Sequence, residues 1–158
     1  MCEAAKKAIT EHIDDFGNPS SIHELGRQAR VLIENARERI AKCINADSSE
    51  IYFTSGGSEA NTLALNNRWY SASSKFEHHS IVSNWPKISI TKDGFIKTHK
   101  LNNMLSERWD TPFDVMSCMY VNNELGTIQQ IKELSTIAHR YGILLHTDAV
   151  QAIPYMHI

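Results

Sequence analysis

The fold is decided by residues 50–65, which read EIYFTSGGSEANTLAL. Glu50–Thr54 is rich in residues that favour β-strands, and the glycine turn after it leads into a helical segment at Thr62–Leu65. A short strand, a glycine turn and a helix in this order predict the start of an α/β unit.

Hydrophobic periodicity extends this prediction in both directions along the chain. Apolar residues recur at helical spacing in three segments: Glu3–Asp15, Glu24–Ile44 and Ile128–Tyr141. Gly142 ends the last of these in the manner of a helix C-cap. Further strands are predicted in four segments: His79–Val82, Ile88–Ile90, Val115–Val121 and Ile143–Asp148.

The predicted fold class is therefore α/β, with a mostly parallel sheet flanked by helices. Val115–Val121 is almost continuously apolar, as expected of parallel strands that are covered on both faces. By contrast, we expect Trp69–Lys75 and Lys100–Thr111 to be exposed, loosely specified segments.

Composition limits the classes of protein that this chain can represent. Its 158 residues are 42% hydrophobic and carry a net charge of −2, which indicates one domain over residues 1–158 with a single core. No run of Lys and Arg provides phosphate attraction, which argues against a nucleic-acid partner. No apolar stretch approaches the roughly 20 residues of a membrane span, and the first residues lack the charged-then-apolar layout of a signal peptide. We therefore expect a cytoplasmic protein without a membrane partner.

Cysteine usage agrees with a reducing compartment. Cys2, Cys43 and Cys118 are odd in number, far apart and in no Cys-x-x-Cys pair. Cys118 lies inside a predicted apolar strand, where a buried, inert thiol is expected.

The glycine turn also indicates a binding site for an anion. Ser55–Ser58 places small residues and backbone N–H groups at a helix N-terminus, where the helix dipole favours a phosphate. A purely structural glycine turn is the alternative. The turn is neither a P-loop nor a dinucleotide fingerprint, because no Lys follows the glycines and the Gly-x-Gly-x-x-Gly spacing is absent.

Three other segments place polar side chains near predicted strands. Asp148 follows the last strand and, if buried, needs a cation or a strong donor, unless it only caps the next helix. Asn122 and Asn123 follow the preceding strand, where their side chains could contact a ligand; the alternative is that they only form a structural turn. His78 and His79 would point to opposite faces of a strand, so a metal site is not expected there.

Five ordered motifs carry a family resemblance. They are GNPSSIH at 17–23, FTSGGSEAN at 53–61, EH at 77–78, VNNELGTIQ at 121–129 and HTDAVQ at 146–151. In this order they resemble the cysteine desulfurases of the NifS and IscS type. These are pyridoxal-phosphate enzymes of the class V aminotransferase group, with the fold type I large domain. The resemblance runs from about Ala4 to Pro154.

The resemblance implies a role for each of six residues. Gly57 and Ser58 match the donors to the cofactor phosphate, and His78 matches the imidazole that stacks on the pyridine ring and moves protons. Asp148 matches the carboxylate that pairs with the protonated ring nitrogen. Asn123 and Gln151 match the side chains around the ring oxygen. The implied substrate is L-cysteine, which gives alanine and a protein persulfide for a sulfur-acceptor protein or for iron–sulfur cluster assembly.

The chain also departs from the family pattern. The family's Schiff-base lysine lies in a Ser-x-His-Lys segment, and none of the nine lysines of this chain has that context. The persulfide cysteine, the substrate arginine, the small C-terminal domain and the family's first strand are expected to be absent as well. The 158 residues alone are therefore expected to be inactive and to bind pyridoxal phosphate noncovalently at best. The alternative is a non-catalytic product, either a truncated or a split-subunit fragment of a class V enzyme, such as one like selenocysteine lyase.

Two structural consequences follow from these departures. Only Ser83–Lys87 separates the predicted strands His79–Val82 and Ile88–Ile90, and five residues cannot form a parallel crossover. Ile88–Ile90 should then pair differently from the family strand, or that edge of the sheet should be disordered. A sheet that lacks its final strands also exposes an edge, so we expect a homodimer or higher self-association.

Overall fold

The computed structural model describes residues 1–66, 70–81, 85–107, 113–153 and 155–156. Within these, the chain forms two compact units, residues 1–52 and residues 53–156, and each is treated by itself. In the described part of the chain no helix is both long enough and apolar enough to cross a membrane.

The first unit consists of two helices and a short 3-10 turn. These are α1 (Glu3–His12), α2 (Glu24–Cys43) and η1 (Ser48–Glu50). The two predicted helices are confirmed, with α1 ending earlier than expected. The predicted strand Glu50–Thr54 is wrong. Asp47 caps Ser49 N at 2.8 Å and Glu50 Oε2 accepts from Asp47 N at 2.7 Å, so a capping box holds residue 50 in η1.

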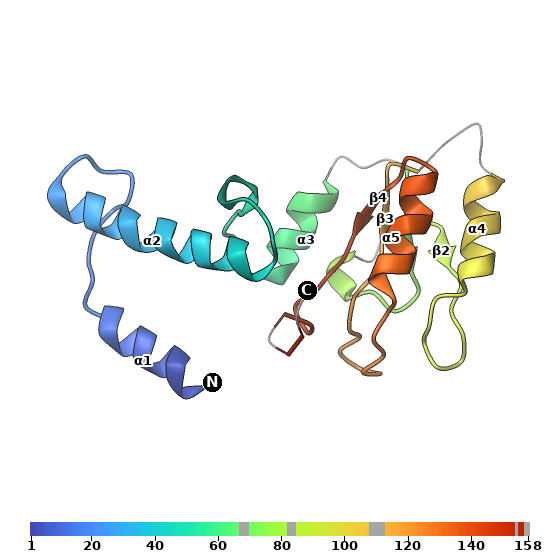
Figure 1. Cartoon of the computed structure of the whole chain (residues 1–158), viewed down its shortest axis with the longest axis horizontal. Coiled ribbons are helices and arrows are strands. Elements are labelled where there is room, and N and C mark those ends of the chain that lie inside the picture. Colours follow the sequence, from blue (N-terminus) through green and yellow to red (C-terminus); the bar gives the residue numbers. More distant parts are fainter. Residues whose placement is uncertain (67–69, 82–84, 108–112, 154, 157–158) are drawn as a thin grey trace. The chain divides into compact units, whose positions relative to one another are not determined.

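The second unit is an α/β sheet structure. Its helical elements are α3 (Gly57–Leu65), η2 (His79–Ile81), α4 (Thr98–Ser106) and α5 (Ile131–Arg140). Its strands are β1 (Ser71–Ser74), β2 (Lys87–Ile88), β3 (Val115–Ser117) and β4 (Leu144–His146). They form one sheet in the order β2-β1-β3-β4, and every neighbouring pair is parallel. The predicted fold class is confirmed (Figure 1).

Helices cover both faces of this sheet. Alternate strand residues point to opposite faces, so Met116 and Val115 enter different clusters. Met116 packs with Ala72 and with buried residues of α4 and α5, whereas Val115 packs with Leu65 of α3 and with Ile81. Figure 1 shows α3 on one side of the sheet and α4 and α5 on the other.

The central strand β1 was not predicted. Trp69–Lys75 was expected to be exposed, yet all four residues of β1 are buried, and Ala72 has 0% exposure. The hydroxyls of Ser73 and Ser74 are satisfied, because Lys87 Nζ donates to Ser73 Oγ at 2.8 Å and the hydroxyl of Ser74 donates to Glu77. Satisfied hydroxyls make a serine-rich strand tolerable inside the sheet.

The expectation for Lys100–Thr111 is also wrong over the residues that are described there. Residues 100–106 belong to α4, whose Leu101 and Leu105 are buried in the main core. Residues 108–111 lie outside the described part of the chain.

The position of β1 also resolves the crossover between the first two strands. His79–Ile81 is a 3-10 turn and not a strand, while Val82 lies outside the described residues. The chain therefore leaves the sheet at Ser74 and returns at Lys87, a connection of twelve residues. Such a connection is long enough for a parallel pair, and β2 does pair parallel with β1. The expected disorder or altered pairing at Ile88–Ile90 rested on a misplaced strand.

The C-terminal half of the unit follows the prediction closely. β3 and β4 lie inside the predicted strands, and α5 lies inside the predicted helix. Gly142 has φ +70° directly after Tyr141, the residue that caps α5, so the predicted glycine cap is confirmed.

Candidate functional site

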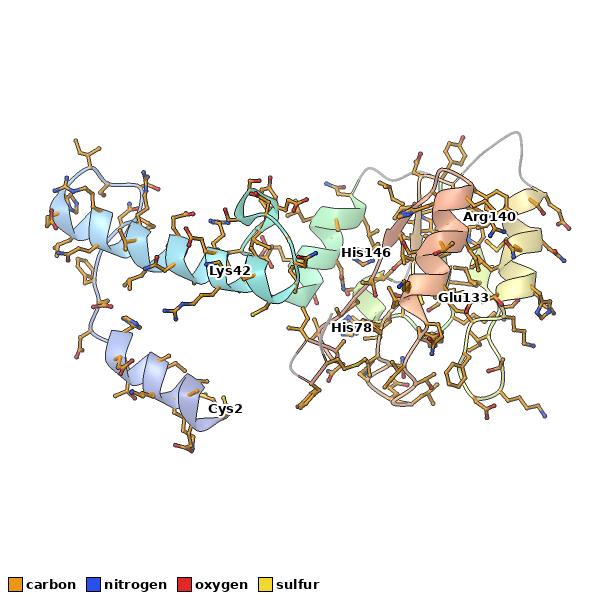
Figure 2. The ribbon with its side chains drawn as sticks, in the orientation of Figure 1. Cys2, Lys42, His78, Glu133, Arg140 and His146 are labelled. Atoms are coloured by element: carbon orange, nitrogen blue, oxygen red, sulfur yellow. The ribbon has the colours of Figure 1, made fainter. Side chains whose placement is uncertain are left out.

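A cavity of about 280 Å³ lies where β3 and β4 end. This is the edge at which open α/β sheets bind their ligands. Eight residues from four parts of the chain line it: Gly57, Ser58, His78, Met119, Asn123, Asp148, Val150 and Gln151. All six residues singled out in the sequence are among them, and Met119 and Val150 were not foreseen. Figure 2 shows His78 beside η2 and His146 at the end of β4.

The N-terminus of α3 forms one wall of the cavity. Gly57 and Ser58 are its first two residues, and no side chain caps this end. The first N–H groups of a helix have no acceptor inside the helix, so they are available to an anion. A Cβ on Gly57 would lie 3.2 Å from Val150 Cγ2, so the missing side chain permits close approach of the helix to the Asp148 loop. The carboxylate of Glu59 turns back to accept from Ser55 N at 2.6 Å.

Asp148 is buried behind this wall, with 6% exposure. Two main-chain bonds hold its loop against β3: Cys118 N donates to His146 O at 3.0 Å, and Tyr120 N donates to Asp148 O at 2.9 Å. Its Oδ1 accepts from Val150 N at 3.1 Å, and its Oδ2 accepts from the amide of Asn61 at 2.9 Å. The bond to Val150 N closes a local turn, and residues 150–153 form no helix, so the alternative of a helix cap at Asp148 is wrong. Both partners are neutral, so neither balances the carboxylate's charge.

His78 is half-buried, and its ring lies against that of His79 with centroids 3.9 Å apart. The expectation that the two rings point to opposite faces is therefore wrong, because η2 replaces the strand. Nδ1 of His78 lies 2.8 Å from Ser80 Oγ and accepts from Ser80 N at 3.2 Å. Among the described residues no group of three His, Cys, Asp or Glu side chains could hold a metal ion.

Asn123 and Gln151 are exposed at the mouth of the cavity, where their side chains can reach a ligand. Their neighbours Asn122 and Gln129 are buried and structural. Asn122 Oδ1 accepts from Leu125 N at 2.7 Å, as expected of a turn. Gln129 binds the 94–96 loop, donating to Gly94 O at 2.7 Å and accepting from Ile96 N at 3.1 Å.

The half-buried carboxylate of Glu77 had no role among the predictions from the sequence. Glu77 accepts from Met119 N at 2.8 Å, from Ser117 Oγ at 3.2 Å and from the hydroxyl of Ser74. Burial raises the pKa of Glu77, against the effect of these hydrogen bonds and with a smaller contribution from Asp148.

Two other titratable groups surround this carboxylate. Burial lowers the pKa of His146, whose Nδ1 lies 3.0 Å from Ser117 Oγ. Burial also raises the pKa of Cys118, and the charge of Glu77 adds to this effect. The prediction of a buried Cys118 is confirmed, and a thiol with a raised pKa is a poor nucleophile.

The raised pKa of Glu77 predicts a pH dependence of stability. The folded chain binds the proton of the Glu77 carboxyl more tightly than the unfolded chain does. Its contribution to stability is therefore complete below the unfolded pKa of 4.5, and it is lost as the pH rises through the raised pKa of the folded chain. Glu77→Gln has no proton to lose. The free energy of unfolding of Glu77→Gln should therefore increase relative to that of the wild type as the pH rises from 4.5 through the folded pKa of Glu77. Urea unfolding at a series of pH values measures both.

The matched control is Glu133→Gln, an exposed carboxylate on α5 that Figure 2 labels. It should keep the wild-type pH profile. His146 acts in the opposite direction, because a lowered pKa removes stability as the pH falls below 6.5. The comparison is therefore made between variants at each pH. Parallel profiles for Glu77→Gln and the wild type would contradict the prediction.

A family model described as aminotransferase class-V matches residues 2–158. This chain belongs to the aminotransferase class-V family. The cysteine desulfurase IscS of Dictyoglomus turgidum is 41% identical over 174 positions, which cover 99% of this chain and 42% of that protein. The cysteine desulfurase IscS of Methanosarcina thermophila is 36% identical, again over 99% of this chain and 42% of that protein.

Solved structures agree with this class V assignment. A NifS-like protein from Rickettsia africae has a TM-score of 0.86 and 31% identity, covering 96% of this chain and 45% of that one. DndA from Streptomyces lividans has a TM-score of 0.77 and 28% identity, covering 95% of this chain and 46% of that one. The resemblance to NifS- and IscS-type cysteine desulfurases is confirmed, and the class V chain spans less than half the length of these relatives.

Proposed function

We propose that the cavity is the pyridoxal-phosphate site of a cysteine desulfurase-like enzyme. One observation carries this proposal: six residues singled out in four separate motifs line the same cavity. The cavity of about 280 Å³ lies near the lower end of the range for small-ligand sites, roughly 300 to 1,000 Å³.

The chemistry of the lining residues fits the groups of pyridoxal phosphate. Gly57 and Ser58 offer N–H groups and a hydroxyl to the phosphate at a helix N-terminus. Asp148 is a buried carboxylate whose hydrogen bonds come from two neutral groups, the Asn61 amide and the Val150 N–H, so it suits a protonated pyridine nitrogen. His78 offers an imidazole to the ring, and Asn123 and Gln151 offer amides to the ring oxygen.

Each residue then has a defined task in the reaction. Bound pyridoxal phosphate supplies an electron sink for cleaving the bond between Cβ and sulfur of L-cysteine. Asp148 would hold the protonated ring nitrogen, and the imidazole of His78 would lie against the ring and be available to carry a proton. In the complete enzyme the products would be alanine and a persulfide, formed when a cysteine thiolate takes the sulfur from L-cysteine as its Cβ–S bond breaks. Selenocysteine remains an alternative substrate, because the lining residues do not distinguish sulfur from selenium.

The 158 residues are proposed to hold the cofactor noncovalently and to be inactive alone. None of their nine lysines lines the cavity, and the buried Cys118 has a raised pKa. The test is a titration of the purified chain with pyridoxal phosphate, followed by borohydride reduction and mass spectrometry. We expect saturable binding, no covalent adduct, and no sulfide or alanine from L-cysteine. Absence of binding would refute the site, and an adduct or product would refute the inactive, noncovalent assignment.

The phosphate position predicts a selective effect of Ser58→Asp. A carboxylate at the second residue of α3 repels the phosphate but suits the helix dipole, so the fold should be retained. We expect pyridoxal phosphate to bind at least about tenfold more weakly, which corresponds to about 1.4 kcal/mol.

Pyridoxal, which lacks the phosphate, is the matched control for this variant. Its affinity should change by less than about twofold, a difference near 0.4 kcal/mol. Equal loss of affinity for both ligands would place the phosphate elsewhere.

Self-association is the second structural proposal. In the described sheet β4 is an edge strand, and Leu144 on it is 53% exposed. In the first unit α1 buries none of its residues, and Phe16 is 85% exposed. Unpaired edges and large exposed apolar side chains favour association. Sedimentation velocity should show a homodimer or larger species at micromolar concentration, and a monomer throughout would contradict this.

A further inference from the structure

Asn61 is buried between Asp148 of the proposed site and Ser80, which lies two residues after His78. It belongs to α3, four residues after Gly57, and therefore lies on the same side of the helix. Its exposure is 5%, and no role was assigned to it in the sequence. A buried amide must use its hydrogen-bonding groups, so its partners indicate what it does.

Both hydrogens of the Asn61 amide are engaged. Nδ2 donates to Asp148 Oδ2 at 2.9 Å and to Ser80 Oγ at 3.0 Å. The orientation of the amide is fixed by chemistry, because a carboxylate only accepts and the amide oxygen would be repelled by it. Asn61 therefore bridges two chain segments that are 68 residues apart, at Ser80 and Asp148.

Ser80 passes this constraint on to His78. Its Oγ accepts from Asn61, which leaves its own hydrogen for Nδ1 of His78 at 2.8 Å. Its backbone N–H also points at the same nitrogen, at 3.2 Å. A backbone N–H can only donate, so Nδ1 is an acceptor and the neutral ring carries its hydrogen on Nε2.

We propose that Asn61 is a positioning residue, which orients the Asp148 carboxylate and, through Ser80, holds His78 as the tautomer with hydrogen on Nε2. The consequence for pyridoxal phosphate rests on the proposed function. Asp148 and His78 would be aligned with one ring by a single amide, so the two groups are set together before the ligand arrives.

The test compares Asn61→Ala with Asn66→Ala, an exposed asparagine just after the same helix. The first readout is NMR of the ring nitrogens of His78 in the chain without ligand, with the signals assigned by His78→Gln. The wild type and Asn66→Ala should show one tautomer, with hydrogen on Nε2. Asn61→Ala should show a mixture, because the Ser80 hydroxyl is then free to turn away from Nδ1, and only the longer 3.2 Å bond from the Ser80 backbone N–H still favours hydrogen on Nε2.

Ser80→Ala is the second variant and does not touch Asp148. It should shift the tautomer as well, so the proposal stays testable if Asn61→Ala does not fold. Wild-type nitrogen shifts in Ser80→Ala, or in a folded Asn61→Ala, would overturn the proposal.

Affinity for pyridoxal phosphate is the second readout. We expect about a tenfold loss in Asn61→Ala, in line with a lost hydrogen bond to a charged group, and less than about threefold in Ser80→Ala. A folded Asn61→Ala with wild-type affinity would overturn the part of the proposal that concerns Asp148. If the wild-type chain binds no pyridoxal phosphate, the proposed function fails, whereas the tautomer measurement still decides the link between Asn61 and His78.

Discussion

The Asp148→Ala variant is expected to bind pyridoxal phosphate about 10 to 100 times more weakly than the wild type, in line with the value of a hydrogen bond to a charged group. Asp148 is 6% exposed, and its carboxylate accepts from the Val150 N–H and from the side-chain amide of Asn61. A protonated ring nitrogen would supply the positive charge that these partners lack. Alanine removes the acceptor, and the amide of Asn61 also loses a partner.

The measurement is an absorbance or fluorescence titration at fixed pH. Asp93→Ala is the matched control, since it removes an exposed carboxylate in the turn before α4, and it should keep wild-type affinity. Thermal unfolding of each variant without ligand separates lost binding from lost folding. A folded Asp148→Ala chain with unchanged affinity would remove Asp148 from the site.

The Ala72→Asp variant is expected not to fold. Ala72 is in β1, an inner strand of the sheet, and has 0% exposure. A carboxylate at this position would lose its hydration without a cationic partner, which costs at least several kcal/mol. Since a domain has only about 5 to 15 kcal/mol of stability, one such charge removes most of it.

Lys75→Asp is the control for this experiment. Lys75 is exposed directly after β1, so the same side chain there should leave the unfolding transition nearly unchanged, within about 0.5 kcal/mol. Circular dichroism and urea unfolding of the two variants give the comparison. If residues 69–75 were an exposed segment, both variants would fold alike, and that outcome would contradict the placement of β1.

Prediction from the sequence worked where burial leaves a hydrophobic pattern. The helix α5 and the strand β3 have buried apolar residues at the spacing that their geometry requires. The periodicity of α2 also predicted a helix, although only Gly26 and Ala41 of it are buried. β1 reads Ser-Ala-Ser-Ser and has no such pattern. Its buried hydroxyls of Ser73 and Ser74 bond to the side chains of Lys87 and Glu77, which hydrophobic periodicity does not reveal. α4 presents only two buried leucines over nine residues, too few for periodicity to detect.

The lining of the cavity was identified through the family motifs, whereas the residues behind it were not. Gly57, Ser58 and Asp148 lie at positions where general rules for helix and strand ends already place ligands. Asn61 was part of a motif but was given no role. Its spacing of four residues from Gly57 was the available signal. The role of Glu77 depends on Ser117 and Met119, forty or more residues away, so no local pattern reveals it.

The distribution of the cavity lining along the chain has a consequence for how the molecule can be assayed. Its residues run from Gly57 to Gln151, which is nearly the full extent of the second unit. No short piece of the chain contains the whole lining, so the site exists only when the strand ends and the start of α3 have come together. Retained pyridoxal phosphate therefore reports the fraction of molecules in which the entire unit is folded, and it could be used to follow refolding without any catalytic step.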